Sequence, residues 1–212
     1  MGYKILYRVS GYEVELDMCE SEETPILVEK DEKNVVFNFK DLEIFLLRKK
    51  VYDMLVDANT QLPKGIHFKI FETYRPMEKQ IKYWEETWAE QKALYPNESD
   101  DDLTRRCEIY IANPHTEGSG HQTGAAIDLT LCDDNGVELD MGAAYLEHSP
   151  KTRTFCQGLT AKQYENRNLL INAMLYGGFI NYFEEWWHFC WGELEWAAST
   201  RVGTTKFLKL KV

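Results

Sequence analysis

The sequence predicts an α+β fold, because helical and strand patterns occupy largely separate parts of the chain. Apolar residues recur at helical spacing mainly between 41 and 111, whereas alternating and aromatic stretches gather between 125 and 191. The 212 residues, 44 % of them hydrophobic, can bury one sizeable core. No repeat, low-complexity stretch or flexible linker divides them. We therefore expect one compact domain, 1–212, rather than a wound βαβ sheet.

The first predicted helix begins at Asp41 and stops at the LPKG turn, 62–65. The segment after it, IHFKIFET at 66–73, is short, β-branched and aromatic, which is typical of a strand. The end of this strand delivers Tyr74 and Arg75. The core-facing residues of the helix recur at helical spacing: Ile44, Leu47, Val51, Met54 and Leu55.

Two further helices are predicted before residue 113. Pro76 is expected to open the second helix as a first-turn proline. The apolar stripe of that helix carries Trp84 and Trp88, which we expect to pack in the core rather than stack on a ligand. Ser99 is expected to cap the third helix, which ends before Asn113.

Strands are predicted after residue 124. Residues 125–131 alternate as a strand does, and the DNG sequence at 134–136 predicts a hairpin turn. Three more elements are expected after it: a helix from the capping box at 160–163 to Gly177, a strand at 179–191 and an edge strand, FLKLKV, at 207–212.

The composition excludes several partners. The formal net charge of −11 argues against nucleic acid, which proteins bind with clustered Lys and Arg. No stretch approaches the roughly 18 consecutive apolar residues of a membrane span, and the N-terminus turns polar too early for a secretory signal. Five scattered cysteines without a C-x-x-C pair suit a reducing compartment. We therefore expect a cytoplasmic protein without a membrane partner, while its oligomeric state stays open.

Two of the five histidines have neighbours suited to a metal site. His121 follows a glycine-bearing loop and precedes Asp128 by seven positions, with small residues between them. His188 lies in the aromatic stretch FEEWWHFCW, 183–191. Zinc takes His nitrogen and Asp oxygen, and a catalytic site keeps three protein ligands and one open position. His121, Asp128 and His188 would fill that set, although H-x6-D pairs also arise by accident in loops.

Glu185, three positions before His188, would supply a base if the backbone bends there. On a regular strand the two side chains would face opposite sides. Zinc lowers the pKa of its water from about 15.7 to about 7, so a neighbouring carboxylate can take the proton and deliver it to a leaving amine. Trp186 and Trp187 would then wall the pocket. The alternative is an aromatic strand in which Glu185 pairs with a lysine or arginine.

Arg75 favours the metal-site hypothesis over the plain strand. Hydrolysis of an amide develops an oxyanion, and a fixed guanidinium is a suitable stabiliser for that charge. An arginine at the end of a strand, held between Tyr74 and Pro76, is well placed for this task. The alternative for Arg75 is a surface salt bridge.

Four motifs in chain order resemble those of a known family: YRP (74–76), SGHQTGAAID (119–128), MG (141–142) and EWWH (185–188). They resemble D-alanyl-D-alanine dipeptidases, the zinc peptidases of vancomycin-resistance clusters and their relatives. These belong to the hedgehog-like group that also contains D,D-carboxypeptidases, and the tryptophan pair of EWWH favours the dipeptidase branch. The resemblance covers roughly 51–191, and 1–36 show no family pattern.

The resemblance implies a compact α+β domain whose small antiparallel sheet presents one zinc ion. It implies these roles: His121, Asp128 and His188 bind the metal, Glu185 is the base and acid, and Arg75 stabilises the tetrahedral intermediate.

Substrate recognition departs from the family pattern. After Met-Gly the family usually has Phe-Asp, whose carboxylate helps to hold the substrate's ammonium, and here Tyr145-Leu146 stand instead. Leu146 cannot hold a cation, and Glu147 is expected to substitute for the missing carboxylate if the loop shifts. Ser119 and Tyr74 are also expected to contact the substrate.

The leading hypothesis is a zinc-dependent dipeptidase that hydrolyses D-Ala-D-Ala or a related small dipeptide. One alternative is a D,D-carboxypeptidase that trims peptidoglycan stem peptides of the cell wall, which the absence of a leader in the sequence disfavours. A second is a non-catalytic binding module that retains zinc. A third is a purely structural zinc site with Cys190 as fourth ligand, because Cys190 would share the strand face of His188.

Overall fold

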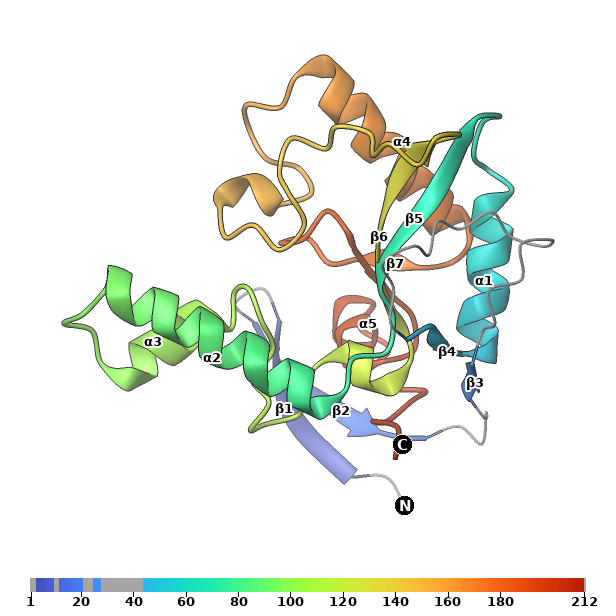
Figure 1. Ribbon diagram of the computed structural model, residues 1–212. Coiled ribbons are helices and arrows are strands. Elements are labelled where there is room, and N and C mark those ends of the chain that lie inside the picture. The colour runs from blue at the N-terminus through green and yellow to red at the C-terminus, as the bar shows by residue number, and fades with distance from the viewer. Residues whose placement is uncertain (1–2, 10–11, 21–24, 28–43, 212) are drawn as a thin grey trace.

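A four-stranded antiparallel sheet forms the centre of the protein (Figure 1). The computed structural model describes residues 3–9, 12–20, 25–27 and 44–211. The sheet has the order β5-β6-β8-β7. Its strands are β5 (Ile66–Glu72), β6 (Ala126–Asp133), β7 (Ile180–Asn181) and β8 (His188–Cys190). The predicted α+β class with a small antiparallel sheet is confirmed.

Two groups of helices flank this sheet in Figure 1. Helices α1 (Lys49–Asn59) and α4 (Ala161–Tyr176) bury their apolar sides in the main core together with the sheet. Helices α2 (Met77–Leu94) and α3 (Asp100–Cys107) form a separate pair that extends away from the sheet. Trp84 lies in the small core between this second pair, as expected from its spacing.

The N-terminal part of the chain adds a hairpin of β1 (Tyr3–Val9) and β2 (Tyr12–Met18). The hairpin packs on the short helix α5 (Leu194–Ser199), and both contribute to a separate apolar cluster. The remaining elements are β3 (Pro25–Leu27), which pairs with β4 (Leu46–Arg48), and the 3-10 turns η1 (Gly120–Thr123) and η2 (Pro150–Thr152). Among the helices that the structure describes, none combines the length and apolarity needed to cross a membrane.

Helix starts agree with the capping residues in the sequence. The Ser99 hydroxyl accepts a hydrogen bond from the backbone N–H of Asp102. Thr160 and Gln163 form the predicted capping box at the start of α4. Pro76 lies at the cap position of α2, one residue earlier than expected.

Four predicted elements differ from the structure. The strand expected at 179–191 is divided into β7 and β8 by the turn that contains Glu185. The first helix begins at Lys49, because Leu47 belongs to β4, and the expected start at Asp41 lies outside the described residues. The turn after β6 forms, but the return strand is reduced to a single bridge between Cys132 and Glu138. Residues 207–211 form no strand, because the backbone N–H groups of Phe207 and Leu210 bond instead with the carbonyls of Gly192 and Gln122, and Phe207 is buried in the core.

Candidate metal centre and active site

The sheet register places two of the predicted ligands directly opposite each other. Asp128 on β6 pairs with His188 on β8, and on its other side it faces Glu72 of β5. Directly opposite residues in an antiparallel pair point to the same face of the sheet. The three side chains therefore form one polar row across the sheet.

His121 reaches the same row from η1, the turn that leads into β6. The Ser119 hydroxyl accepts a hydrogen bond from the His121 backbone N–H at 3.3 Å. Gly120 permits the close approach of this turn to α5, because a Cβ there would lie 2.6 Å from Oε2 of Glu193. The Nδ1–H of His121 donates to the Thr73 carbonyl at 2.6 Å. Since a carbonyl only accepts, Nε2 of His121 carries the lone pair.

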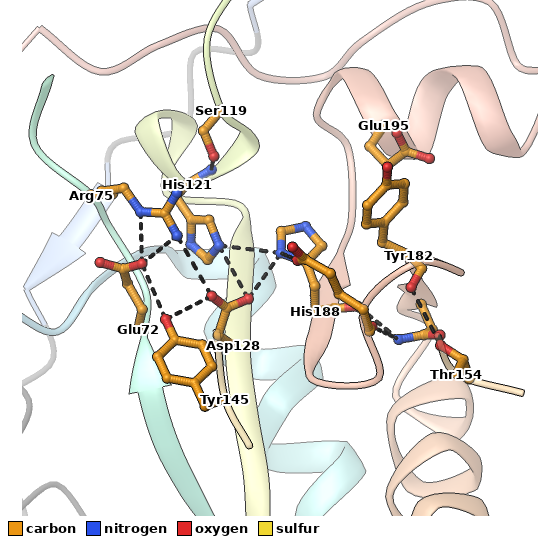
Figure 2. A network of polar contacts seen from close by, with 12 residues as sticks. Glu72, Arg75, Ser119, His121, Asp128, Tyr145, Thr154, Tyr182, His188 and Glu195 are labelled. Carbon is orange, nitrogen blue, oxygen red and sulfur yellow. Dashed lines mark hydrogen bonds and ion pairs between the residues drawn. The ribbon is translucent and has the colours of Figure 1, made fainter. Parts of the chain in front are cut away.

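The three candidate ligand atoms converge (Figure 2). Nε2 of His121 lies 3.2 Å from Nδ1 of His188 and 3.2 Å from Oδ1 of Asp128, and the last two atoms are 2.9 Å apart. In a tetrahedral site with bonds of 2.0–2.1 Å, ligand atoms are about 3.3 Å apart. The donor set of two imidazoles and one carboxylate therefore fits zinc in type and in spacing.

Asp128 is held in its charged form. Burial alone would raise the pKa of this carboxyl, but its contacts with His121 and His188 hold the pKa well below its usual range. The second oxygen, Oδ2, accepts a hydrogen bond from the Tyr145 hydroxyl at 3.0 Å. One oxygen thus faces the histidines, while the other is held by the Tyr145 hydroxyl.

Glu185 is brought to the same site by a turn. The His188 backbone N–H donates to the Glu185 carbonyl at 3.3 Å, so the chain folds back between these two residues. Oε2 of Glu185 consequently lies 4.0 Å from Nδ1 of His188. Burial raises the pKa of Glu185 to about 8, and the Asp128 charge adds to this effect while His188 opposes it. The bend on which the predicted base depends is present.

Arg75 lies on the opposite side of Asp128 from His188 in Figure 2. Its Nε donates to Oε2 of Glu72 at 2.7 Å and its second terminal nitrogen contacts the same carboxylate. The other terminal nitrogen donates to the Gln80 side chain at 2.9 Å. Burial opposes the charged form of Arg75, but the charge of Glu72 raises its pKa above the ordinary value. Arg75 is therefore a buried, fixed cation rather than a surface residue.

These groups line one cavity of about 640 Å³, a size typical of small-molecule sites. Its walls come from six parts of the chain: β1 and β2, the segment after β5, the segment from α3 to η1, β6 with the loop after it, the turn before β8 with His188, and the start of α5. The predicted site residues in its lining are Arg75, Ser119, His121, Asp128, Glu185 and His188.

Two predicted substrate contacts lie outside this lining. Tyr74 is not part of the cavity wall. The Glu147 carboxylate accepts hydrogen bonds from the Ser149 hydroxyl at 2.5 Å and the Ala144 backbone N–H at 3.0 Å, and it also stays outside the wall. Leu146, in contrast, does line the cavity. The loop has therefore not shifted in the way that would bring Glu147 to the substrate.

The tryptophan pair and Cys190 also differ from expectation. Trp186 and Trp187 are each 2 % exposed and pack in the main core, and neither lines the cavity. Cys190 is buried but is not part of the His121, Asp128 and His188 cluster, which is the only such group among the described residues. This leaves the structural four-ligand hypothesis without its fourth ligand.

No motif in the sequence marked three supporting residues. Glu72 pairs with Arg75, Tyr145 with Asp128, and Glu195 lines the cavity from α5. The three-residue spacing of Glu72 and Arg75 could have suggested their pairing, whereas Tyr145 and Glu195 are far from their partners in sequence.

The sequence model of the D-Ala-D-Ala dipeptidase family matches residues 34–200. The D-alanyl-D-alanine dipeptidase of Escherichia coli is 34 % identical over 151 residues, which cover 68 % of this chain and 67 % of that protein. The D-alanyl-D-alanine dipeptidase of Synechocystis is 31 % identical over 150 residues, 60 % of each chain. The chain thus spans about two thirds or less of the length of these relatives.

Among solved structures, a vancomycin-resistance D,D-pentapeptidase in complex with Zn(II) aligns with a TM-score of 0.47 and 20 % identity, over 76 % of this chain and 80 % of that chain. The family assignment depends on the sequence matches, which extend through all four motifs and the converging residues described above. This chain belongs to the D-Ala-D-Ala dipeptidase family of peptidases.

Proposed function

We propose that this chain is a zinc-dependent dipeptidase that hydrolyses D-Ala-D-Ala or a related small dipeptide. The observation that carries the proposal is the convergence of His121, Asp128 and His188 in one cavity, with the Glu185 carboxylate beside them. Membership of the family, whose relatives bear the name of this activity, supports the substrate class.

The three converging residues would hold one zinc ion per chain. When bound, zinc supplies a Lewis acid that polarises the scissile carbonyl and lowers the pKa of a water to about 7. His121 is oriented for this role by its bond to the Thr73 carbonyl, and Asp128 by its bond from Tyr145. Such supporting bonds fix the tautomer and direction of metal ligands.

Glu185 would move the protons. Its carboxylate lies close to the cluster and is not one of the three converging ligands. It can therefore accept a proton from the attacking water and pass it to the nitrogen of the leaving amine. The side chain is only 17 % exposed, which shields the transfer from bulk water.

Arg75 would stabilise the negative charge that develops on the carbonyl oxygen. The guanidinium lines the cavity, remains charged and is held by Glu72 and Gln80. A cation that is already oriented needs no reorganisation when the charge appears, and in a water-poor cavity its field is weakly screened.

The test is hydrolysis by zinc-loaded protein of D-Ala-D-Ala, N-acetyl-D-Ala-D-Ala and L-Ala-L-Ala, with Glu185→Ala as the blank and metal analysis of both proteins. Cleavage of the free D,D-dipeptide by the wild type, with about one zinc per chain in each protein, is the expected result. Stoichiometric zinc without cleavage of any peptide would instead favour a binding module.

A second candidate function is D,D-carboxypeptidase activity on longer peptides. The cavity extends from the metal cluster past Tyr182 to the hairpin residues Leu6 and Glu13 and to Glu108, so it offers room beyond a dipeptide. Cleavage of the acetylated peptide in the same assay would favour this candidate over the first.

A further inference from the structure

The cavity contains a buried carboxylate that the proposed chemistry does not use. Glu195, in the first turn of α5, lines the cavity and is 8 % exposed. The Ser199 hydroxyl donates to its Oε1 at 2.5 Å and the Tyr7 hydroxyl to its Oε2 at 3.3 Å. Among the described residues, no lysine, arginine or histidine forms an ion pair with it. An ionised carboxylate has about four acceptor sites, so two donors leave it only partly satisfied.

The other carboxylates near the centre of the cavity are already engaged. Glu184 pairs with Arg153 at 2.7 Å, and Asp128 faces the two histidines. Glu193 accepts hydrogen bonds from the backbone N–H groups of Glu195 and Trp196, at 2.9 and 2.7 Å. Glu193 and Glu195 are thus both buried and form no ion pair among the described residues, but the Glu193 oxygens are held by backbone N–H groups, whereas those of Glu195 meet only two hydroxyl donors.

The surroundings of Glu195 disfavour a lone negative charge. Burial, with a smaller contribution from the neighbouring Glu193, raises its pKa to about 7, although the hydrogen bonds from Ser199 and Tyr7 oppose the shift. Buried charges in proteins are paired as a rule. A cation delivered by a ligand would supply the missing partner.

Glu195 and the metal cluster lie in the wall of one cavity. Figure 2 shows Arg75 and Glu195 on opposite sides of the metal cluster, with the Tyr182 ring next to Glu195. The Tyr182 ring meets the His188 ring edge-on at 6.1 Å between centroids, so the same wall continues from the metal ligands to Glu195. Leu146, also in the lining, offers no charge.

We propose that Glu195, held by Tyr7 and Ser199, binds an ammonium group of the substrate. This inference rests on the proposed function and specifies its substrate class as peptides that carry a free amine. The amine can be the N-terminus of a dipeptide or the side chain of a basic residue, and both would make the same charge-assisted hydrogen bonds with the carboxylate.

The variant Glu195→Gln tests this inference, because the amide keeps the shape and can still bond to Tyr7 and Ser199. Glu184→Gln is the matched control, since it removes a negative charge from the same cavity at a glutamate already paired with Arg153. We expect Glu195→Gln to raise KM for D-Ala-D-Ala about 10- to 100-fold, with kcat little changed. The affinity for N-acetyl-D-Ala-D-Ala should not change, and Glu184→Gln should resemble the wild type.

Binding measurements separate this inference from the proposed function. Zinc-loaded Glu185→Ala protein, with and without Glu195→Gln, is titrated calorimetrically with D-Ala-D-Ala, N-acetyl-D-Ala-D-Ala and Nα-acetyl-D-Lys-D-Ala. Weaker binding of the free dipeptide alone on Glu195→Gln identifies the N-terminal amine as the ligand, and weaker binding of the lysine peptide identifies a side-chain amine.

Equal affinity of both proteins for all amine-bearing peptides, or no binding of any of them, would overturn the assignment of Glu195. Failure of the wild type to cleave any peptide would refute the dipeptidase proposal, while amine binding that depends on Glu195 would still stand as its own result. Variants are compared only if their circular dichroism spectra and zinc contents match the parent protein.

Discussion

The Tyr145 hydroxyl donates a 3.0 Å hydrogen bond to Oδ2 of Asp128, while Oδ1 of the same carboxylate lies 2.9 Å from Nδ1 of His188. One carboxylate oxygen therefore faces His188 and the other accepts the hydrogen bond from Tyr145. Tyr145 itself stacks on Phe71 of β5 with ring centroids 4.4 Å apart, so the donor is fixed by packing.

Tyr145→Phe should weaken zinc binding about 10- to 100-fold, because it removes the bond that orients Asp128 and leaves the ring in place. Competition with a chromogenic chelator measures the affinity. Tyr164→Phe is the control, since Tyr164 is half exposed on α4. Unchanged affinity in Tyr145→Phe would mean that Asp128 needs no such support.

Glu185→Gln should lower kcat about 100- to 10,000-fold, because an amide cannot accept and release the proton. Zinc content should stay at the wild-type level, since Glu185 is not one of the three converging ligands. Metal analysis of the same preparation is the check. Loss of zinc together with activity would reassign Glu185 as a ligand.

Arg75→Lys should lower kcat about 100- to 1,000-fold with a smaller change in KM. A lysine keeps the charge but cannot contact Glu72 through two nitrogens and Gln80 through a third. Steady-state kinetics on D-Ala-D-Ala measure the effect. Lys79→Gln is the matched control, because Lys79 pairs with Glu72 at 2.8 Å without lining the cavity. Similar losses of kcat in both variants would indicate that activity depends on the pairing of Glu72 with nearby cations and not on the Arg75 guanidinium itself.

Glu195 should make the protein less stable as the pH rises. Its folded-state pKa of about 7 lies above the usual value of 4.5, so the unfolded chain loses this proton at a lower pH than the folded chain does. The free energy of unfolding therefore falls as the pH rises from about 4.5 to about 7. The charged or titratable groups around it are Glu193, which raises the pKa, His188, which lowers it, Tyr7, whose hydrogen bond lowers it, and Tyr182.

Glu195→Gln removes this titration. Between pH 5 and pH 8 the wild type should lose about 2 to 3 kcal/mol of unfolding free energy relative to the variant. Urea unfolding of both zinc-loaded proteins at the two pH values measures the difference. A difference independent of pH would show that Glu195 titrates alike in the folded and unfolded chains.

Local signals in the sequence predicted the elements that depend on neighbouring residues. Ser99 and Thr160 cap their helices because each side chain accepts a hydrogen bond from the backbone N–H three residues later, a contact that depends only on neighbouring residues. The start of the first helix failed for the opposite reason. Leu47 fits a helical stripe but pairs in β4 with Ile26, a partner 21 positions away that periodicity does not reveal.

The same contrast applies to the site. The motifs indicated the three converging residues and Glu185, whose chemistry is carried by residue type and spacing. Trp186 and Trp187 were expected at the cavity but lie in the core. The turn that brings Glu185 to the cavity directs the next two side chains into the core. Tyr145 contacts Asp128, 17 positions away, and Glu195 contacts Tyr7, 188 positions away, so no local pattern marks these contacts.

The hairpin of β1 and β2 has a consequence for how such proteins diversify. Leu6 and Tyr7 of β1 line the cavity, yet they precede residue 34, where the family match begins. The proposed reacting groups and part of the cavity wall therefore lie in different stretches of the sequence. Exchange of the hairpin alone between relatives would be expected to change which peptide is accepted, while the metal ligands and the proton-transferring glutamate stay untouched.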